Sequence, residues 1–144
     1  MGAIMAEKRV RPANMPWLTP MLTVRDAALA LEFYETAFGL TRRDVMRDEA
    51  GTVTHADLTY HDAVIMIAPA EPGGPRTPAE SGLLSAALFY LYCEDVDALF
   101  ARAAAAGAGV KMPPTDMPWG DRMASFSDLD GHTWNFATHL DGAA

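Results

Sequence analysis

The sequence predicts an α+β fold in which two βαβββ repeats form paired mixed sheets around a cleft. Three observations predict it: a proline- and glycine-rich segment near the middle of the chain, a repeat on either side of that segment, and strand-like and helix-like runs in the same order within each repeat. A chain of 144 residues fits one domain. We place this domain at residues 17–144, after a flexible N-terminal leader at residues 1–16.

The middle segment, residues 69–82, contains four prolines and three glycines. Proline removes a backbone hydrogen-bond donor and cannot continue a helix, so we expect neither a helix nor a central strand there. The segment is therefore predicted to be a linker between a first half at residues 17–68 and a second half at residues 83–139.

The two halves align at a single offset of 69 residues. This shift places Val24 on Cys93, near the ends of two strand-like runs, and it also places Met66 on Asn135, within the last strand-like run of each half. One offset that aligns both the first and the last strand is difficult to obtain by chance. It indicates an internal duplication.

A helix is predicted after the first strand-like run of each half. Asp26 and Asp95, which the same shift aligns, stand where an N-cap residue accepts a hydrogen bond from the first helical turn. Apolar residues then recur at steps of three and four. Gly39 supplies a stop for the first helix, and Gly107 or Gly109 supplies one for the second.

Further strand-like runs follow each helix. They lie at residues 42–47, 53–59 and 63–68 in the first half, and at a proline-rich stretch, residues 123–127 and residues 132–138 in the second. A four-stranded sheet with one helix leaves one face uncovered, so we expect the two sheets to pair edge to edge and enclose a cleft. The pattern leaves open whether the halves pair within one chain or across a swapped dimer.

The composition excludes several classes of function. Eleven basic and nineteen acidic residues give a net charge of −8, with no basic face for a nucleic acid or an anionic membrane. No apolar run approaches the roughly 18 residues of a membrane span, and residues 1–16 lack the apolar core of a secretory signal. The single cysteine, Cys93, excludes an internal disulfide and suits a reducing compartment, so we expect a cytoplasmic protein.

Two motifs carry a family resemblance. The first is Val24-Arg25-Asp26 followed by a helix that ends in Phe33-Tyr34-Glu35-Thr36-Ala37-Phe38-Gly39-Leu40, and the second is Asp128-Leu129-Asp130-Gly131-His132-Thr133-Trp134. Over residues 17–139 the chain resembles the vicinal oxygen chelate superfamily, which includes glyoxalases, dioxygenases and bleomycin-binding proteins. The resemblance implies the duplicated fold, a small-molecule ligand and a homodimer.

Within that superfamily the chain is similar to a glyoxalase-like subgroup, whose members mostly have no known activity. The motifs that carry this similarity are His55-Ala56-Asp57-Leu58, Trp119-Gly120-Asp121-Arg122 and Trp134-Asn135-Phe136-Ala137-Thr138-His139.

The metal ligands that the resemblance implies are missing. Metal-using members place His, Gln or Glu on the first and last strand of each half, and here those positions carry Thr19, Met66, Leu88 and Asn135. Divalent ions need several imidazole, carboxylate or thiolate groups at one point. We therefore expect no metal and no cofactor. A register error of one residue brings in no ligand either.

Strand periodicity extends the predicted cleft lining from these four positions. The expected ligand-binding residues are Thr19, Met21, His55, Asp57, Met66, Leu88, Tyr90, Tyr92, Trp119, Arg122 and Asn135. A mixed aromatic, thioether and polar lining is typical of sites that hold a mostly apolar molecule. Trp119 is expected to stack on a flat ligand and Arg122 to pair with an anion. Alternatively, Arg122 pairs with Asp121 within its loop, and the two tyrosines are structural.

His55 and Asp57 are the candidate catalytic residues. They lie two apart on a predicted strand and therefore face the same way, about 7 Å apart. A histidine beside a carboxylate can work as an acid–base unit, and the same pair can start a relocated metal site, although no third ligand is evident. The alternative is that the two side chains bond to each other and only support the sheet.

Three functions fit these observations. The first is a metal-independent binding protein that sequesters an antibiotic or a metabolite. The second is a lyase or isomerase that uses His55 and Asp57 or a relocated metal. The third is a structural or regulatory module whose own side chains fill the cleft.

Overall fold

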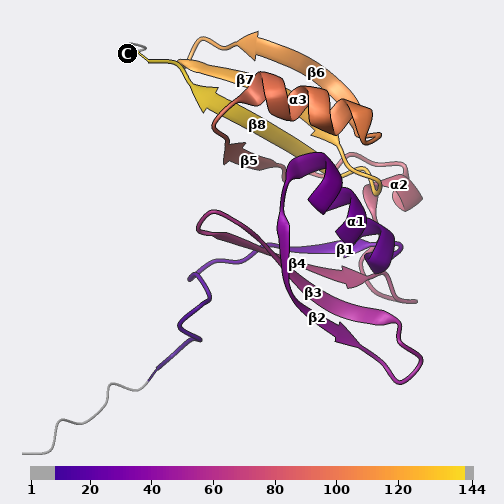
Figure 1. Cartoon of the computed structure of the whole chain (residues 1–144). Coiled ribbons are helices and arrows are strands. Elements are labelled where there is room, and N and C mark those ends of the chain that lie inside the picture. The colour runs from indigo at the N-terminus through magenta and orange to yellow at the C-terminus, as the bar shows by residue number, and fades with distance from the viewer. Residues whose placement is uncertain (1–8, 142–144) are drawn as a thin grey trace, which may run out of the picture.

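The computed structural model describes residues 9–141 and contains two sheets and three helices (Figure 1). The elements in chain order are β1 (Met21–Val24), α1 (Ala27–Phe38), β2 (Thr41–Arg47), β3 (Val53–Tyr60), β4 (Ala63–Pro69), α2 (Pro78–Ser81), β5 (Phe89–Tyr92), α3 (Val96–Ala105), β6 (Gly109–Asp116), β7 (Asp121–Ser127) and β8 (Thr133–His139).

The two sheets have the same topology. Their strand orders are β1-β4-β3-β2 and β5-β8-β7-β6, and in each sheet the first strand runs parallel to the last while the other pairs are antiparallel. Met21 pairs with Met66 in the first sheet, and Tyr90 pairs with Asn135 at the equivalent place in the second. The predicted α+β fold of two βαβββ repeats is confirmed.

Both long helices begin where the sequence predicts. The side chain of Asp26 accepts a hydrogen bond from the Leu29 amide, and that of Asp95 accepts one from the Ala98 amide, each at 3.1 Å. Gly39 ends α1 in the left-handed conformation, with φ of 71°, which glycine adopts without steric cost. None of the helices within residues 9–141 is long and apolar enough to cross a membrane.

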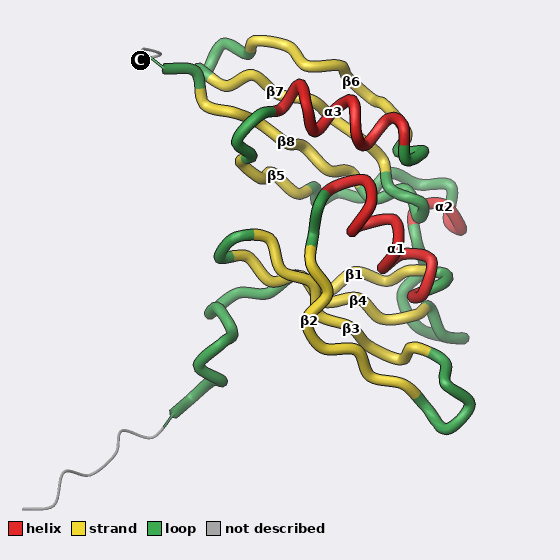
Figure 2. The backbone as a smooth tube through the Cα atoms, viewed as in Figure 1, coloured by secondary structure: helices red, strands yellow, loops and turns green. Residues whose placement is uncertain are grey.

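The core lies between the two sheets, and α1 crosses it (Figures 1 and 2). Tyr34 and Phe38 of α1 contact the ring of Trp134 in the second sheet, with centroids 5.3 and 5.2 Å away. Asp128 accepts hydrogen bonds from the Tyr34 hydroxyl at 2.6 Å and the Trp134 indole at 2.9 Å. The helix of the first half is therefore part of the core of the second.

The sheets are not joined edge to edge. Within the described residues every strand pair lies inside one sheet, and β1 and β5 are both edge strands. Helices α1 and α3 contact each other instead, and Arg102 of α3 donates hydrogen bonds to the carbonyls of Thr36 and Glu35 at 2.7 and 2.8 Å. The edge-to-edge pairing expected from the sequence is thus not found within one chain, because packed helices connect the halves.

The middle segment contains a short helix, so the expectation that residues 69–82 form none is wrong. Thr77 caps α2 by accepting a hydrogen bond from the Glu80 amide, while the Glu80 carboxylate accepts one from the Thr77 amide, both at 3.1 Å. Pro78 occupies the start of the helix, where its missing N–H is not needed. The Ala79 amide also donates to the Asp130 carbonyl at 2.9 Å, which holds the helix against the second half.

Candidate functional site

Each sheet has an outer face that no helix covers, and the predicted ligand-binding residues other than Arg122 divide between these two faces or lie at their edges. Asp57, Met66 and Met21 lie in one row across the first sheet, and Asn135 lies beside Tyr90 in the second. The intervening residues are buried in the core, including Leu22, Ile67, Trp134 and Phe136. The alternation expected from the sequence therefore has the correct register.

The polar residues of the first outer face are already paired. Asp57 as a whole is 7% exposed. One of its carboxylate oxygens lies 2.9 Å from His55 Nε2, and the other accepts a hydrogen bond of 2.9 Å from Arg43. Arg43 also donates to the Asn14 carbonyl at 2.9 Å. The two candidate catalytic residues do contact each other, and the arginine neutralises the buried carboxylate.

Arg43 was not predicted as a neighbour of this pair. Strand β2 changes register between Arg42 and Val45 and again between Met46 and Arg47. A bulge inserts a residue and re-aims the side chains, so a strict alternation assigns the wrong face.

The second outer face holds a cluster around Asp121, which is only 2% exposed. One carboxylate oxygen accepts hydrogen bonds from the hydroxyls of Tyr90 at 2.6 Å and Tyr92 at 2.9 Å, and the other lies 2.9 Å from His139 Nδ1. The Trp119 indole donates to the Tyr90 hydroxyl oxygen at 3.0 Å. We call these five residues the Asp121 cluster.

Two subgroup motifs meet in this cluster. Trp119 and Asp121 belong to the Trp-Gly-Asp-Arg motif, and His139 closes the C-terminal motif. Asp121 and His139 were not among the predicted site residues, although their motifs were recognised. Their pairing depends on β7 and β8, which place the two residues opposite each other.

The hydrogen bonds fix the charge state of the cluster. The bond from Tyr90, followed by those from His139 and Tyr92, holds the pKa of the Asp121 carboxyl below its usual value. Burial and the hydrogen bond to Asp121 raise the pKa of Tyr90 to about 12. At neutral pH Asp121 is therefore charged and both tyrosines keep their protons, which point toward the carboxylate.

Asn135 lies next to this cluster and lacks a partner. The residue is 9% exposed, and its Oδ1 is the one buried side-chain nitrogen or oxygen within residues 9–141 that makes no hydrogen bond. It is flanked by Tyr90 on β5 and Ser125 on β7. An unpaired buried acceptor costs about 1–3 kcal/mol, so the Asn135 amide destabilises the ligand-free protein by an amount of that order.

Arg122 does not lie on the outer face. It donates two hydrogen bonds of 3.0 Å to Asp97 of α3 and a third of 3.0 Å to Asp116. These contacts hold α3 against β7 and raise the pKa of the guanidinium. The expected contact between Arg122 and Asp121 is absent from the hydrogen bonds of the described residues, since successive strand residues point to opposite faces.

The two outer faces do not meet in one chain. No hydrogen bond or ion pair within the described part of the chain joins a candidate residue of the first sheet to one of the second. Thr19 lies two residues before β1, and Leu88, 52% exposed, lies directly before β5.

The two sheets of the chain share one topology, and a comparison of the sequence with family models identifies a family. The family model "Glyoxalase/Bleomycin resistance protein/Dioxygenase superfamily" matches residues 16–136. The chain belongs to this superfamily.

Relatives in the glyoxalase/bleomycin-resistance superfamily span most of the chain. An uncharacterized protein of Mycobacterium bovis, Mb0911c, is 36% identical over 124 residues, which cover 83% of this chain and 81% of that protein. TioX from Micromonospora sp. ML1 is 31% identical, with a TM-score of 0.68, over 85% of this chain and 98% of that one. The fosfomycin resistance protein FosX from Listeria monocytogenes shares the fold at 16% identity, with a TM-score of 0.64, over 87% and 92% of the chains.

The metal site of the superfamily does not fit this chain. Its four positions carry Thr19, Met66, Leu88 and Asn135. Leucine has no donor atom, a thioether suits only soft ions, and neutral hydroxyl and amide oxygens are weak ligands for hard divalent cations. Within residues 9–141, no three His, Cys, Asp or Glu side chains converge on one point.

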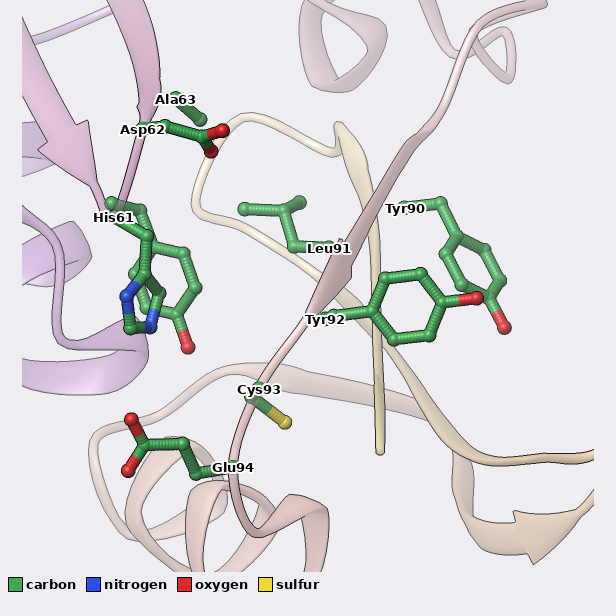
Figure 3. A pocket seen from close by; sticks show the side chains of 9 residues that line it. His61, Asp62, Ala63, Tyr90, Leu91, Tyr92, Cys93 and Glu94 are labelled. Atoms are coloured by element: carbon green, nitrogen blue, oxygen red, sulfur yellow. The ribbon is translucent and has the colours of Figure 1, made fainter. Parts of the chain in front are cut away.

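A hollow of about 490 Å³ runs along the free edge of β5. It is lined by Tyr60, His61, Asp62, Ala63 and residues 90–94. Figure 3 shows the rings of Tyr90 and Tyr92 on one side of the strand and His61 on the other. Burial raises the pKa of the Cys93 thiol, which makes a reactive thiolate unfavourable here.

Proposed function

We propose that this protein binds a small molecule without a metal and sequesters it, as an antibiotic- or metabolite-binding member of its superfamily. The observation that carries the proposal is the group of exposed aromatic rings of the Asp121 cluster, next to the buried and unpartnered Oδ1 of Asn135. Aromatic surface with a few fixed polar groups is the usual composition of a small-molecule site.

The complete site is proposed to form in a homodimer. Because α1 lies between the sheets, one chain leaves both outer faces open, with Met21 59% and Tyr92 56% exposed. Large exposed apolar patches mark interaction surfaces, and the short edge strands β1 and β5 offer unpaired backbone groups. If the first face of one copy covers the second face of another, a twofold axis produces two equal sites.

In such a dimer the first face supplies Met21, Met66, His55 and Asp57, with Thr19 at its edge. The second supplies Asn135 and the aromatic residues, with Leu88 at its edge. Arg122 is left out of the proposed site, because its three hydrogen bonds hold α3.

Binding is tested by thermal denaturation of protein purified without chelator or affinity tag. The panel contains aromatic and peptide antibiotics, quinones and glutathione adducts, each with and without EDTA. A ligand at about 100 times its Kd adds about 2.7 kcal/mol of stability, which raises Tm by several degrees. A shift that survives EDTA supports the proposal. Absence of any shift contradicts it and favours a structural module, and a stoichiometric metal contradicts metal independence.

A second function, a lyase or isomerase, is favoured by one observation, the 2.9 Å contact between His55 and Asp57. Asp57 would orient the imidazole, which would move a proton to or from a bound ligand. Turnover of a panel compound that is lost in His55→Gln supports this reading. Stoichiometric binding with no product, measured by mass spectrometry over hours, supports sequestration.

A further inference from the structure

We infer that the Asp121 cluster recognises an organic cation, a protonated amine or a guanidinium group attached to an apolar body. This inference rests on the proposed function and specifies the chemical class of its ligand. Four features carry it: the direction of the tyrosine hydroxyls, the arrangement of the rings, the charge of Asp121 and the free oxygen of Asn135.

The hydroxyl groups of the cluster can only accept further hydrogen bonds. Tyr90 and Tyr92 both donate their protons to Asp121, at 2.6 and 2.9 Å. Each phenol has a single proton, which Asp121 accepts. The Tyr90 oxygen also accepts a hydrogen bond from the Trp119 indole at 3.0 Å, whereas no donor within the described residues reaches the Tyr92 oxygen. Donation to a carboxylate also polarises each phenol and strengthens its oxygen as an acceptor. A ligand group that meets these oxygens must therefore be a donor.

The aromatic rings form a corner that suits a cation. The centroids of Tyr90 and Tyr92 lie 5.7 Å apart and their planes meet at 67°. Trp119 is bonded to the Tyr90 hydroxyl and is 52% exposed. Ring faces carry negative potential, and cations bind over tyrosine and tryptophan within about 6 Å of the centroid.

The charge of Asp121 has no lysine or arginine partner. Within the described residues its carboxylate contacts only Tyr90, Tyr92 and His139, while its neighbour Arg122 is bonded to two other aspartates. The first face differs, because Arg43 neutralises Asp57 there. A bound cation would balance the buried charge, and the net charge of −8 attracts cations to the protein as a whole.

The positions of Asn135 and Lys111 indicate how a ligand would be oriented on the second outer face. Asn135 lies beside Tyr90 in the strand register, and its buried Oδ1 makes no hydrogen bond, so a small shift of the side chain would give a donor on the ligand a second acceptor. Further along, Lys111 donates to the Thr133 hydroxyl at 2.8 Å. The cationic group therefore belongs at the Asp121 end, and the apolar body extends over Asn135 toward the lysine.

Three probes of similar shape and different charge test the inference: 2-phenylethylamine, 2-phenylethanol and 3-phenylpropionate. Binding is measured on the full-length protein by NMR titration, which follows the indole N–H of Trp119. At pH 7 we expect the amine to bind at least tenfold more tightly than the alcohol and the acid. The amine becomes neutral when it is deprotonated. Its tighter binding relative to the alcohol should therefore disappear when the titration is repeated above the pKa of the amine.

Two variants locate the effect. Asp121→Asn removes the charge, and Tyr92→Leu removes an exposed ring; each should reduce amine affinity about tenfold while changing alcohol affinity by less than threefold. Tyr60→Phe changes a tyrosine outside the cluster and serves as the matched control. Melting curves establish whether each variant is folded. If Asp121→Asn does not fold, Tyr92→Leu still provides the test.

The possible failures are distinguishable. Equal or tighter binding of the alcohol or the acid overturns the inference and leaves the proposed function intact, as does a neutral panel compound that binds when the amine does not. Amine selectivity that persists in both variants places recognition elsewhere and also overturns it. If no probe and no panel compound binds, both proposals are wrong.

Discussion

Two buried aspartates occupy the outer faces of the sheets, and their partners differ. Asp57 is hydrogen-bonded to Arg43, a permanent cation, and to His55. Asp121 is hydrogen-bonded to the phenols of Tyr90 and Tyr92 and to the imidazole of His139. The first arrangement pairs the charge with an arginine inside the chain, whereas the second contains no lysine or arginine among the described residues. In our proposal this difference directs a cationic group to Asp121 and not to Asp57.

Asn135→Leu should stabilise the ligand-free protein and weaken ligand binding. Replacing an unpartnered buried amide by an apolar side chain of similar size removes a penalty of about 1–3 kcal/mol, so we expect about 1 kcal/mol of added stability. Urea unfolding measures this change, and the amine titration measures the binding. Asn135→Ala, which leaves a cavity, should not stabilise. A destabilised Asn135→Leu variant would show that the amide supports the fold instead.

Asp121→Asn should reveal the pH dependence of the cluster. The pKa of Asp121 is lowered in the folded protein, chiefly by the hydrogen bond from Tyr90. A lowered folded-state pKa contributes stability above the unfolded value of about 4, and this contribution is lost as the pH falls through the folded value. The Tm difference between the wild type and Asp121→Asn should therefore be largest near neutral pH and shrink toward pH 3.

The control for this experiment is Asp62→Asn, an exposed aspartate in the turn between β3 and β4. Its Tm difference from the wild type should stay small at every pH. If the Tm difference between the wild type and Asp121→Asn were constant from pH 3 to neutral pH, the charge of the carboxylate would contribute nothing to the stability of the fold.

At the scale of elements, the sequence predicted the helix ends that are determined by local interactions. Asp26 and Asp95 cap their helices as expected, and Gly39 ends α1 with a positive φ. The expectation failed for α2, because the capping pair Thr77 and Glu80 stabilises a single turn within a segment dominated by proline and glycine.

Side-chain direction was predicted where strands are regular and missed where they are not. The outward direction of Met21 and Met66 in the first sheet, and of Asn135 in the second, follows from simple alternation. Arg43 depends on the bulge in β2, and the pairing of Asp121 with His139 depends on the register of β7 and β8. Neither a bulge nor the register between strands is encoded in the period of a single strand.

Arg122→Ala should lower stability slightly and leave ligand affinity unchanged, because its hydrogen bonds join β7 to α3 and its side chain is off the outer face. Melting curves and the amine titration measure the two effects. Arg47→Ala, at an exposed arginine of β2, is the matched control for loss of a surface charge. A large loss of affinity in Arg122→Ala would place the guanidinium in the site after all.

At the scale of the whole molecule, the sequence could not decide how the halves sit together. The apolar stripe of α1 looks the same whether the helix covers one sheet or lies between two. Its position follows from contacts across the chain, such as those of Phe38 with Trp134 and Phe136. These contacts turn the uncovered faces outward, so a closed site requires a second copy in our proposal.

A mixing experiment tests that requirement. Met66→Glu places a charge on the first outer face, and Tyr92→Leu removes a ring from the second; each variant alone should bind the ligand about tenfold more weakly while remaining folded and dimeric. If every site combines the first face of one copy with the second face of another, a mixed dimer has one site with both defects and one intact site. Random exchange between equal amounts of the two variants should then restore about a quarter of the wild-type sites.

Titration calorimetry counts the restored sites, and light scattering follows the oligomeric state. A double variant that carries both substitutions in one chain is the control, since its dimers contain no intact site at any mixing ratio. If sites formed within single chains, mixing would restore nothing, because every chain would carry one damaged face. Recovery of binding after mixing therefore distinguishes a shared site from two independent ones, whatever the identity of the ligand.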